Sequence, residues 1–167
     1  MTDIITIQTN YGDIIVELNA EKAPQTVENF LQYIEANFYE NTLFHRVIPN
    51  FMVQGGGFDT NFNQKPAKQR VENEADNELP NDIGTIAMAR TADPHSASSQ
   101  FFINTAKNDF LNYQSRSTQG WGYCVFGKVT EGMDIIDKIS AVPTGSRMGH
   151  QNVPKDDVVI TNISKKE

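Results

Sequence analysis

The chain alternates short runs of β-branched and aromatic residues with turn residues, and this rhythm limits what it can fold into. Residues 4–9 and 13–18 form the first pair, with an Asn-Tyr-Gly turn between them. In the second run Ile14, Val16 and Leu18 alternate against Asp and Glu, as in a strand with one buried face. Similar runs bring the number of predicted short strands to about eight: 43–48, 51–54, 83–89, 100–104, 123–129 and 157–163.

Two helices interrupt the predicted strands. Pro24 suits a first turn, and apolar residues between 27 and 34 recur at i, i+3, i+4 and i+7. A second, shorter helical pattern covers 132–141, and 59–81 is predicted as a long surface loop with one short strand. Because strands and helices do not alternate, a parallel doubly wound sheet is disfavoured. The pattern favours an antiparallel barrel with helices over its open ends.

Composition narrows the class of protein. The 167 residues suffice for one core, and we expect a single domain over 1–167. A net charge of −7 disfavours nucleic-acid binding, which needs a basic surface. The N-terminal residues show neither a secretory signal nor a membrane span, so we expect a cytoplasmic protein. No helical seam or apolar patch demands a dimer, and we expect a monomer.

The run 44–57 (FHRVIPNFMVQGGG) sets a cation and an amide among large apolar side chains. A cation among Phe and Met is costly to bury unless it has a partner or a task. Arg46 and Gln54 therefore either satisfy each other within the fold or face a ligand. Strand alternation predicts that Phe44, Arg46 and Ile48 share one face.

Large apolar side chains on short strands and loops accompany these polar residues. They are Phe51, Met52, Phe102, Phe110 and Leu111. Most such residues in any chain belong to the core. The presence of Arg46, Gln54 and Gln100 alongside these residues favours a pocket instead. An apolar pocket with a few placed hydrogen-bond donors is the usual form of a ligand site.

Other chemistries have weaker support. His45, His95, His150 and Cys124 lack the spacing of a zinc or iron site, so we expect no metal or other cofactor. Cys124 lies in an apolar run and is interpreted as a buried small side chain. The glycines at 55–57 precede no Lys-Ser/Thr pair, which favours a turn or bulge over a phosphate site. Serines follow His95, but no Gly-x-Ser-x-Gly elbow supports a hydrolase.

The run 44–57 resembles the signature of the cyclophilins, the peptidyl-prolyl cis-trans isomerases. Four further segments match in order: 84–90 (GTIAMAR), 99–104 (SQFFIN), 108–111 (NDFL) and 125–129 (VFGKV). Segment 119–126 (QGWGYCVF) is most similar to the cytoplasmic bacterial branch, to which cyclophilin B of enterobacteria belongs. The resemblance implies a closed eight-stranded antiparallel β-barrel capped by two α-helices, with the substrate groove on its outer surface.

The resemblance also implies a role for each matched position. Arg46 matches the catalytic arginine, and Gln54 matches the glutamine that binds substrate backbone and steadies the arginine. Ala89 and Arg90 match positions whose backbone meets the peptide beside the proline, and Gln100 lines the adjoining pocket. Four apolar residues match the walls of the proline pocket: Phe51, Met52, Phe102 and Leu111.

Two groove positions depart from the eukaryotic pattern. Phe110 replaces a tryptophan and Tyr123 replaces a histidine. Loss of the indole N–H removes a donor to cyclosporin, so we expect weak binding of that inhibitor. The expected partners are proline-containing peptides and unfolded or partly folded proteins. A chaperone or proline-binding module, in which turnover is secondary, stays open as an alternative to an isomerase, although simple proline recognition needs no buried cation such as Arg46.

Overall fold

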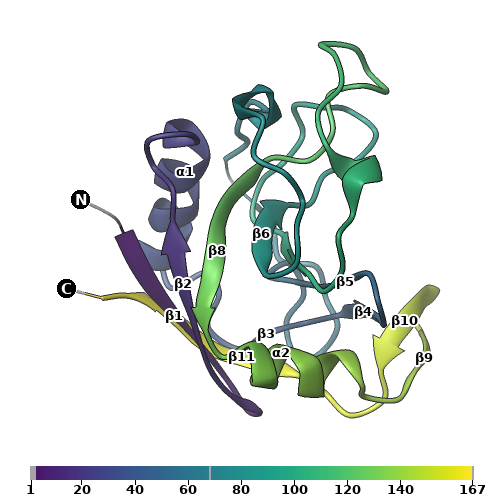
Figure 1. Cartoon of the computed structure of the whole chain (residues 1–167). Coiled ribbons are helices and arrows are strands. Elements are labelled where there is room, and N and C mark those ends of the chain that lie inside the picture. The colour runs from purple at the N-terminus through teal and green to yellow at the C-terminus, as the bar shows by residue number, and fades with distance from the viewer. Residues whose placement is uncertain (1–2, 68, 167) are drawn as a thin grey trace.

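The structure is a computed structural model that describes residues 3–67 and 69–166. Its largest element is a nine-stranded antiparallel sheet (Figure 1). The strands follow one another across the sheet in the order β3-β11-β1-β2-β8-β6-β7-β5-β4. Their bounds are β1 (Asp3–Thr9), β2 (Gly12–Leu18), β3 (Thr42–Leu43), β4 (Arg46–Ile48), β5 (Met52–Gly55), β6 (Thr85–Met88), β7 (Phe101–Asn104), β8 (Val125–Glu131) and β11 (Val159–Lys165).

The sheet curls until its two edges meet. The edge strands β3 and β4 are separated by only Phe44 and His45, so the two ends of the sheet lie together. The chain after β5 then bonds β3, since Gly56 N–H donates to Leu43 O at 3.3 Å and Leu43 N–H donates to Phe58 O at 2.8 Å. The mainly-β, barrel-like fold is confirmed. It differs from the expected closed eight-stranded barrel in strand number and in this irregular closure.

Two α-helices cover opposite ends of the curled sheet in the described part of the chain, as predicted (Figure 1). Helix α1 (Pro24–Glu35) starts at its proline and buries Val27, Phe30 and Ile34. Helix α2 (Met133–Ser140) is shorter and buries two isoleucines. Single turns of 3₁₀-helix, η1 (Ala75–Asn77) and η2 (Asp109–Leu111), lie in the loops. Within 59–67 and 69–81 the structure has η1 and isolated bridges at Asp59 and Gln64 instead of the predicted short strand.

The core inside the sheet is rich in aromatic rings. Phe30 lies 5.1 Å from Phe126 and 5.6 Å from Phe101, between ring centres. Phe44 also packs against Phe101 and joins Val47 in this core, so the prediction that Phe44 shares a face with Arg46 is wrong. The chain leaves β3 and enters β4 at this point, and strand alternation does not continue through the break.

A hairpin of β9 (Thr144–Arg147) and β10 (His150–Pro154) was not predicted. Met148 and Gly149 form its two-residue turn with φ of 49° and 83°. Two positive φ values match the turn that joins tightly twisted hairpins. No helix among the described residues combines the length and apolar character needed to cross a membrane.

Candidate active site

Strand register places the predicted polar pair on the outer face of the sheet. Arg46 on β4 lies opposite Gln54 on β5, and Gln54 lies opposite Phe102 on β7. The neighbouring row, Val47 opposite Val53, belongs to the buried core. Because successive side chains point to opposite faces of a strand, the first row points outward. Short strands thus set a cation, an amide and an aromatic ring side by side.

A chain of hydrogen bonds holds Arg46. Its Nη1 donates to Gln54 Oε1 at 3.3 Å, and Gln54 Nε2 donates to Gln100 Oε1 at 3.0 Å. A Cβ at Gly57 would come within 2.4 Å of the Gln100 side chain, so the glycine lets that side chain lie flat against the backbone. Arg46 has no carboxylate within 4.0 Å among the described residues. Gln54, itself held by Gln100, thus orients the arginine, and no carboxylate in the described chain pairs with its charge.

An apolar cluster, separate from the core, lies beside the arginine. Its buried members are Met52, Ala87, Phe102, Leu111 and Val125. Phe51, Ala89 and Tyr123 pack against it. Phe110 stands at its rim, 68% exposed, with its ring 5.7 Å from that of Phe51. All the predicted apolar site residues therefore gather on this outer face.

Tyr123 and Arg90 form the far side of the site. The Tyr123 ring lies edge-on to Phe102, with centres 5.7 Å apart, and the Arg90 guanidinium lies over Tyr123 at 4.4 Å. Ala89 N–H donates to Gln100 O at 3.0 Å, which links this side to the polar chain. The resemblance implied a backbone role for Arg90, whereas the structure also gives its side chain defined contacts.

Three buried asparagines, which sequence reasoning missed, fix the loops of the site. Asn108 Nδ2 donates to Phe51 O at 2.9 Å and to Asn104 Oδ1 at 2.8 Å. Asn81 Nδ2 donates to Leu111 O at 3.2 Å, and Asn104 Nδ2 donates to Asn81 Oδ1 at 3.0 Å. Buried amides need such partners. The one signal for this network in the sequence was Asn104, which ends the apolar strand β7.

Comparison with known proteins decides the family of the chain. The family model described as "Cyclophilin type peptidyl-prolyl cis-trans isomerase/CLD" matches residues 4–165. The chain belongs to the cyclophilin family. Peptidyl-prolyl cis-trans isomerase B of Escherichia coli (strain K12) is 54% identical over 98% of this chain and 100% of its own length. Isomerase cyp18 of Streptomyces antibioticus is 55% identical over 93% of this chain and 94% of its own length.

Solved structures agree with this membership. A cyclophilin-type isomerase of Cryptosporidium parvum has a TM-score of 0.83 at 29% identity, covering 100% of this chain and 99% of its own. The same parasite's protein in the presence of the dipeptide Ala-Pro gives 0.81 at 30% identity, covering 98% and 99%. The expected enzyme class, a peptidyl-prolyl cis-trans isomerase, is confirmed.

The other candidate chemistries find little support in this cyclophilin. Ser96 Oγ donates to Asp93 O at 2.7 Å, and His95 Nδ1 accepts from Asn73 N–H, so both atoms have partners other than each other. Burial raises the pKa of the Cys124 thiol to about 12, which leaves it protonated and unreactive. No three His, Cys, Asp or Glu side chains gather into a possible metal site within 3–67 and 69–166.

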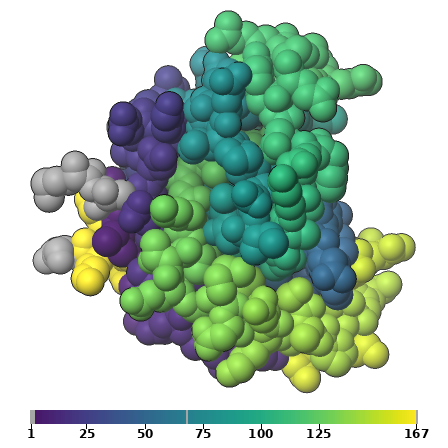
Figure 2. All heavy atoms as spheres, in the orientation of Figure 1, coloured from purple at the N-terminus to yellow at the C-terminus, as the bar shows by residue number. Residues whose placement is uncertain are grey.

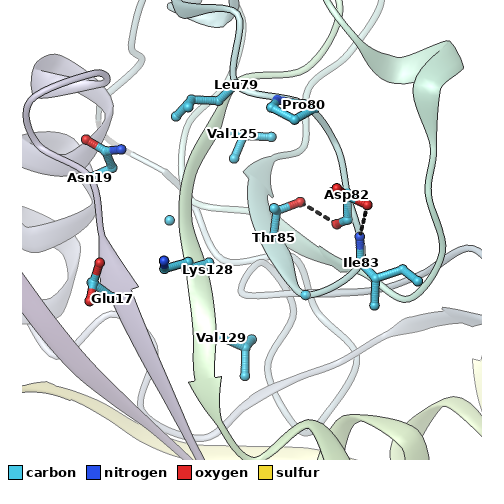
Figure 3. A pocket seen from close by; sticks show the side chains of 12 residues that line it. Glu17, Asn19, Leu79, Pro80, Asp82, Ile83, Thr85, Val125, Lys128 and Val129 are labelled. Carbon is cyan, nitrogen blue, oxygen red and sulfur yellow. Dashed lines mark hydrogen bonds between the residues drawn. The ribbon is translucent and has the colours of Figure 1, made fainter.

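A hollow of about 420 Å³ lies on the outer face of β2, β8 and β6 (Figure 3). In Figure 2 the green atoms of β8 are seen between purple β2 and the teal segment that precedes β6. Glu17 and Lys128, which are register partners, line it together with Ile83. Val125 lines the hollow and belongs to the apolar cluster, and Leu79 lines the hollow and packs against that cluster, so the hollow adjoins the candidate site.

Proposed function

We propose that this cyclophilin accelerates rotation about Xaa-Pro peptide bonds in peptides and folding proteins, and that the outer-face cluster beside Arg46 is where it does so. The observation that carries the proposal is an arginine with no carboxylate partner in the described chain, held by Gln54 at the edge of an apolar floor. That combination suits a substrate with an apolar ring and an amide nitrogen.

Arg46 supplies the catalytic donor in this proposal. An amide resists rotation because nitrogen shares its lone pair with the carbonyl, and the barrier is about 18–20 kcal/mol. A donor aimed at the prolyl nitrogen stabilises the twisted state, in which the lone pair is free. The donor gains little in the planar ground state, so it acts selectively on the transition state. Arginine suits the task because it stays charged and presents a fixed fork of donors.

The apolar cluster clamps the proline ring while the carbonyl side turns. Phe51, Met52, Phe102 and Leu111 are the proposed walls, and all four belong to or pack against the outer-face cluster. Around them lie the groups proposed to hold or border the peptide chain: Gln54, Ala89, Arg90, Gln100, Phe110 and Tyr123. Holding the substrate in a productive geometry lowers the entropic cost of reaching the transition state. No bond is made or broken, so the reaction requires no nucleophile, metal or cofactor.

A binding module or chaperone is the second candidate function. The same groove would hold a proline-containing segment with turnover secondary, but aromatic grooves recognise proline without a half-buried cation such as Arg46. We extend the proposal to a single-domain monomer in the cytoplasm with weak cyclosporin binding, in line with the resemblance to the cytoplasmic bacterial branch. The Cryptosporidium parvum relative crystallised with Ala-Pro supports proline-containing substrates for the family.

Exchange spectroscopy on a short Xaa-Pro peptide tests the proposal. Uncatalysed exchange takes tens to hundreds of seconds at 25 °C and gives separate, sharp cis and trans resonances. Catalytic amounts of the wild-type chain are expected to produce cross-peaks between them. An Arg46→Gln variant at equal concentration is expected to produce far weaker ones. Saturable peptide binding without faster exchange by the wild-type chain would favour the binding module.

A further inference from the structure

The two arginines in the candidate site differ from the other arginines of the chain. The sequence contains five, and three of these bind an aspartate at 2.8 to 3.1 Å. The pairs are Arg70 with Asp93, Arg116 with Asp76, and Arg147 with Asp157. Arg46 and Arg90 have no carboxylate within 4.0 Å in the described residues. Since the net charge is −7, acidic side chains are in excess, yet none in 3–67 or 69–166 pairs with these two cations.

Arg90 is held in place by contacts that leave its charge uncompensated. Its guanidinium lies 4.4 Å over the Tyr123 ring, its Nε donates to Gly122 O at 3.1 Å, and its Nη1 donates to Thr91 O at 2.9 Å. Gly122 has φ of 69°, and a Cβ there would come within 2.6 Å of Leu111 O, so glycine fixes this carbonyl. The other three N–H groups of the guanidinium bond no protein atom in the described chain.

The position of Arg90 places it within reach of a bound peptide. Tyr123 lies 5.7 Å from Phe102 and 4.4 Å from the guanidinium carbon, so this carbon is within about 10 Å of the Phe102 ring. An extended peptide advances about 3.3–3.6 Å per residue. A side chain up to three residues from a proline on Phe102 therefore reaches the guanidinium.

We propose that Arg90 gives this enzyme a preference for substrates with a carboxylate side chain within three residues of the isomerising proline. This inference rests on the proposed function of the groove. A guanidinium presents parallel donors that match the two oxygens of a carboxylate, and charge-assisted bonds of this kind are strong. Because Tyr123 and two carbonyls already orient Arg90, little side-chain freedom is lost when an acidic residue binds.

The test compares kcat/KM for peptides that place Glu, Gln or Lys at each of the three positions on either side of one proline. Blocked N-termini and amidated C-termini leave the side chain as the one variable charge. At one position or more, the wild type is expected to prefer Glu over Gln by about fivefold to tenfold at low salt, with Lys below Gln. Since 1 M salt shortens the screening length to about 3 Å, the preference is expected to fade there.

Variants assign the preference to Arg90. The Glu-to-Gln ratio is read within each variant, so a general change in activity cancels. Arg90→Gln is expected to bring the ratio close to one, and Arg90→Lys, which keeps the charge, to retain part of it. Arg116→Gln makes the same charge change at an exposed ion pair elsewhere and is expected to keep the full ratio.

Two results overturn the inference while leaving the proposed function intact. One is a wild-type ratio near one at every position, with all peptides turned over. The other is an Arg90→Gln variant that keeps the wild-type ratio. If the wild type turned over none of the peptides, the proposed function itself would be wrong, and the inference with it.

Discussion

Acid is expected to destabilise this cyclophilin through His45, the neighbour of Arg46 in the chain. The His45 ring is only 5% exposed and packs against Phe58, with ring centres 4.4 Å apart. Its Nδ1 is buried and has no hydrogen-bond partner among the described residues. Burial, together with smaller contributions from the nearby charges of His150 and Arg46, lowers the pKa of His45 from 6.5 to about 4.

The sign and size of the effect follow from this pKa. In the unfolded chain His45 takes up a proton near pH 6.5, whereas the folded chain resists protonation until about pH 4. Between these values the unfolded state binds more protons, so the free energy of unfolding falls as the pH falls. A shift of one pKa unit corresponds to about 1.36 kcal/mol, so the shift of the His45 pKa lowers the free energy of unfolding in acid by roughly 3 kcal/mol. The free energy of unfolding of a whole domain is only about 5–15 kcal/mol.

Urea unfolding at pH 7, 5.5 and 4 measures this loss against a His45→Phe variant. The variant keeps a flat aromatic ring on Phe58 but does not titrate. The carboxylates titrate in both proteins, so the difference between the two pH profiles isolates His45. The wild type is expected to lose roughly 3 kcal/mol more than the variant by pH 4. Parallel pH profiles for the two proteins would mean that His45 does not cause the loss of stability in acid.

Two other residues offer direct tests. Asn104→Ala leaves the buried amides of Asn81 and Asn108 short of a partner. It is expected to cost about 2–3 kcal/mol in urea unfolding, and a loss below 0.5 kcal/mol would contradict the role of this network. Phe110→Trp adds an indole N–H at the exposed rim and is expected to tighten cyclosporin binding about tenfold by calorimetry. Unchanged affinity would show that the missing donor does not limit cyclosporin binding.

The sequence predicted local features well where period and turn chemistry decide them. Helix α1 begins at Pro24, as predicted, and Arg46 points outward, as the resemblance implied by placing the groove on the outer surface. The face assigned to Phe44 was wrong, because the closing edge of the sheet breaks the alternation there. That break depends on how distant strands meet, which a local pattern does not record.

Long-range partners were beyond the sequence pattern for a similar reason. The links from Asn108 to Phe51 and from Arg90 to Tyr123 join segments far apart in the chain. A lone asparagine or arginine is compatible with many environments, so its type alone does not identify a partner. The β9–β10 hairpin was the exception, because Gly149 in its turn was a usable local signal.

The most direct test of the account concerns Arg46 and separates turnover from binding. Steady-state kinetics on one Xaa-Pro peptide would compare the wild type with Arg46→Ala, with thermal unfolding as the control for folding. If Arg46 stabilises only the twisted state, kcat should fall by about 100-fold or more, KM should stay within about threefold, and the melting temperature should change little. An unchanged kcat with a raised KM would contradict the account, because Arg46 would then merely hold the peptide.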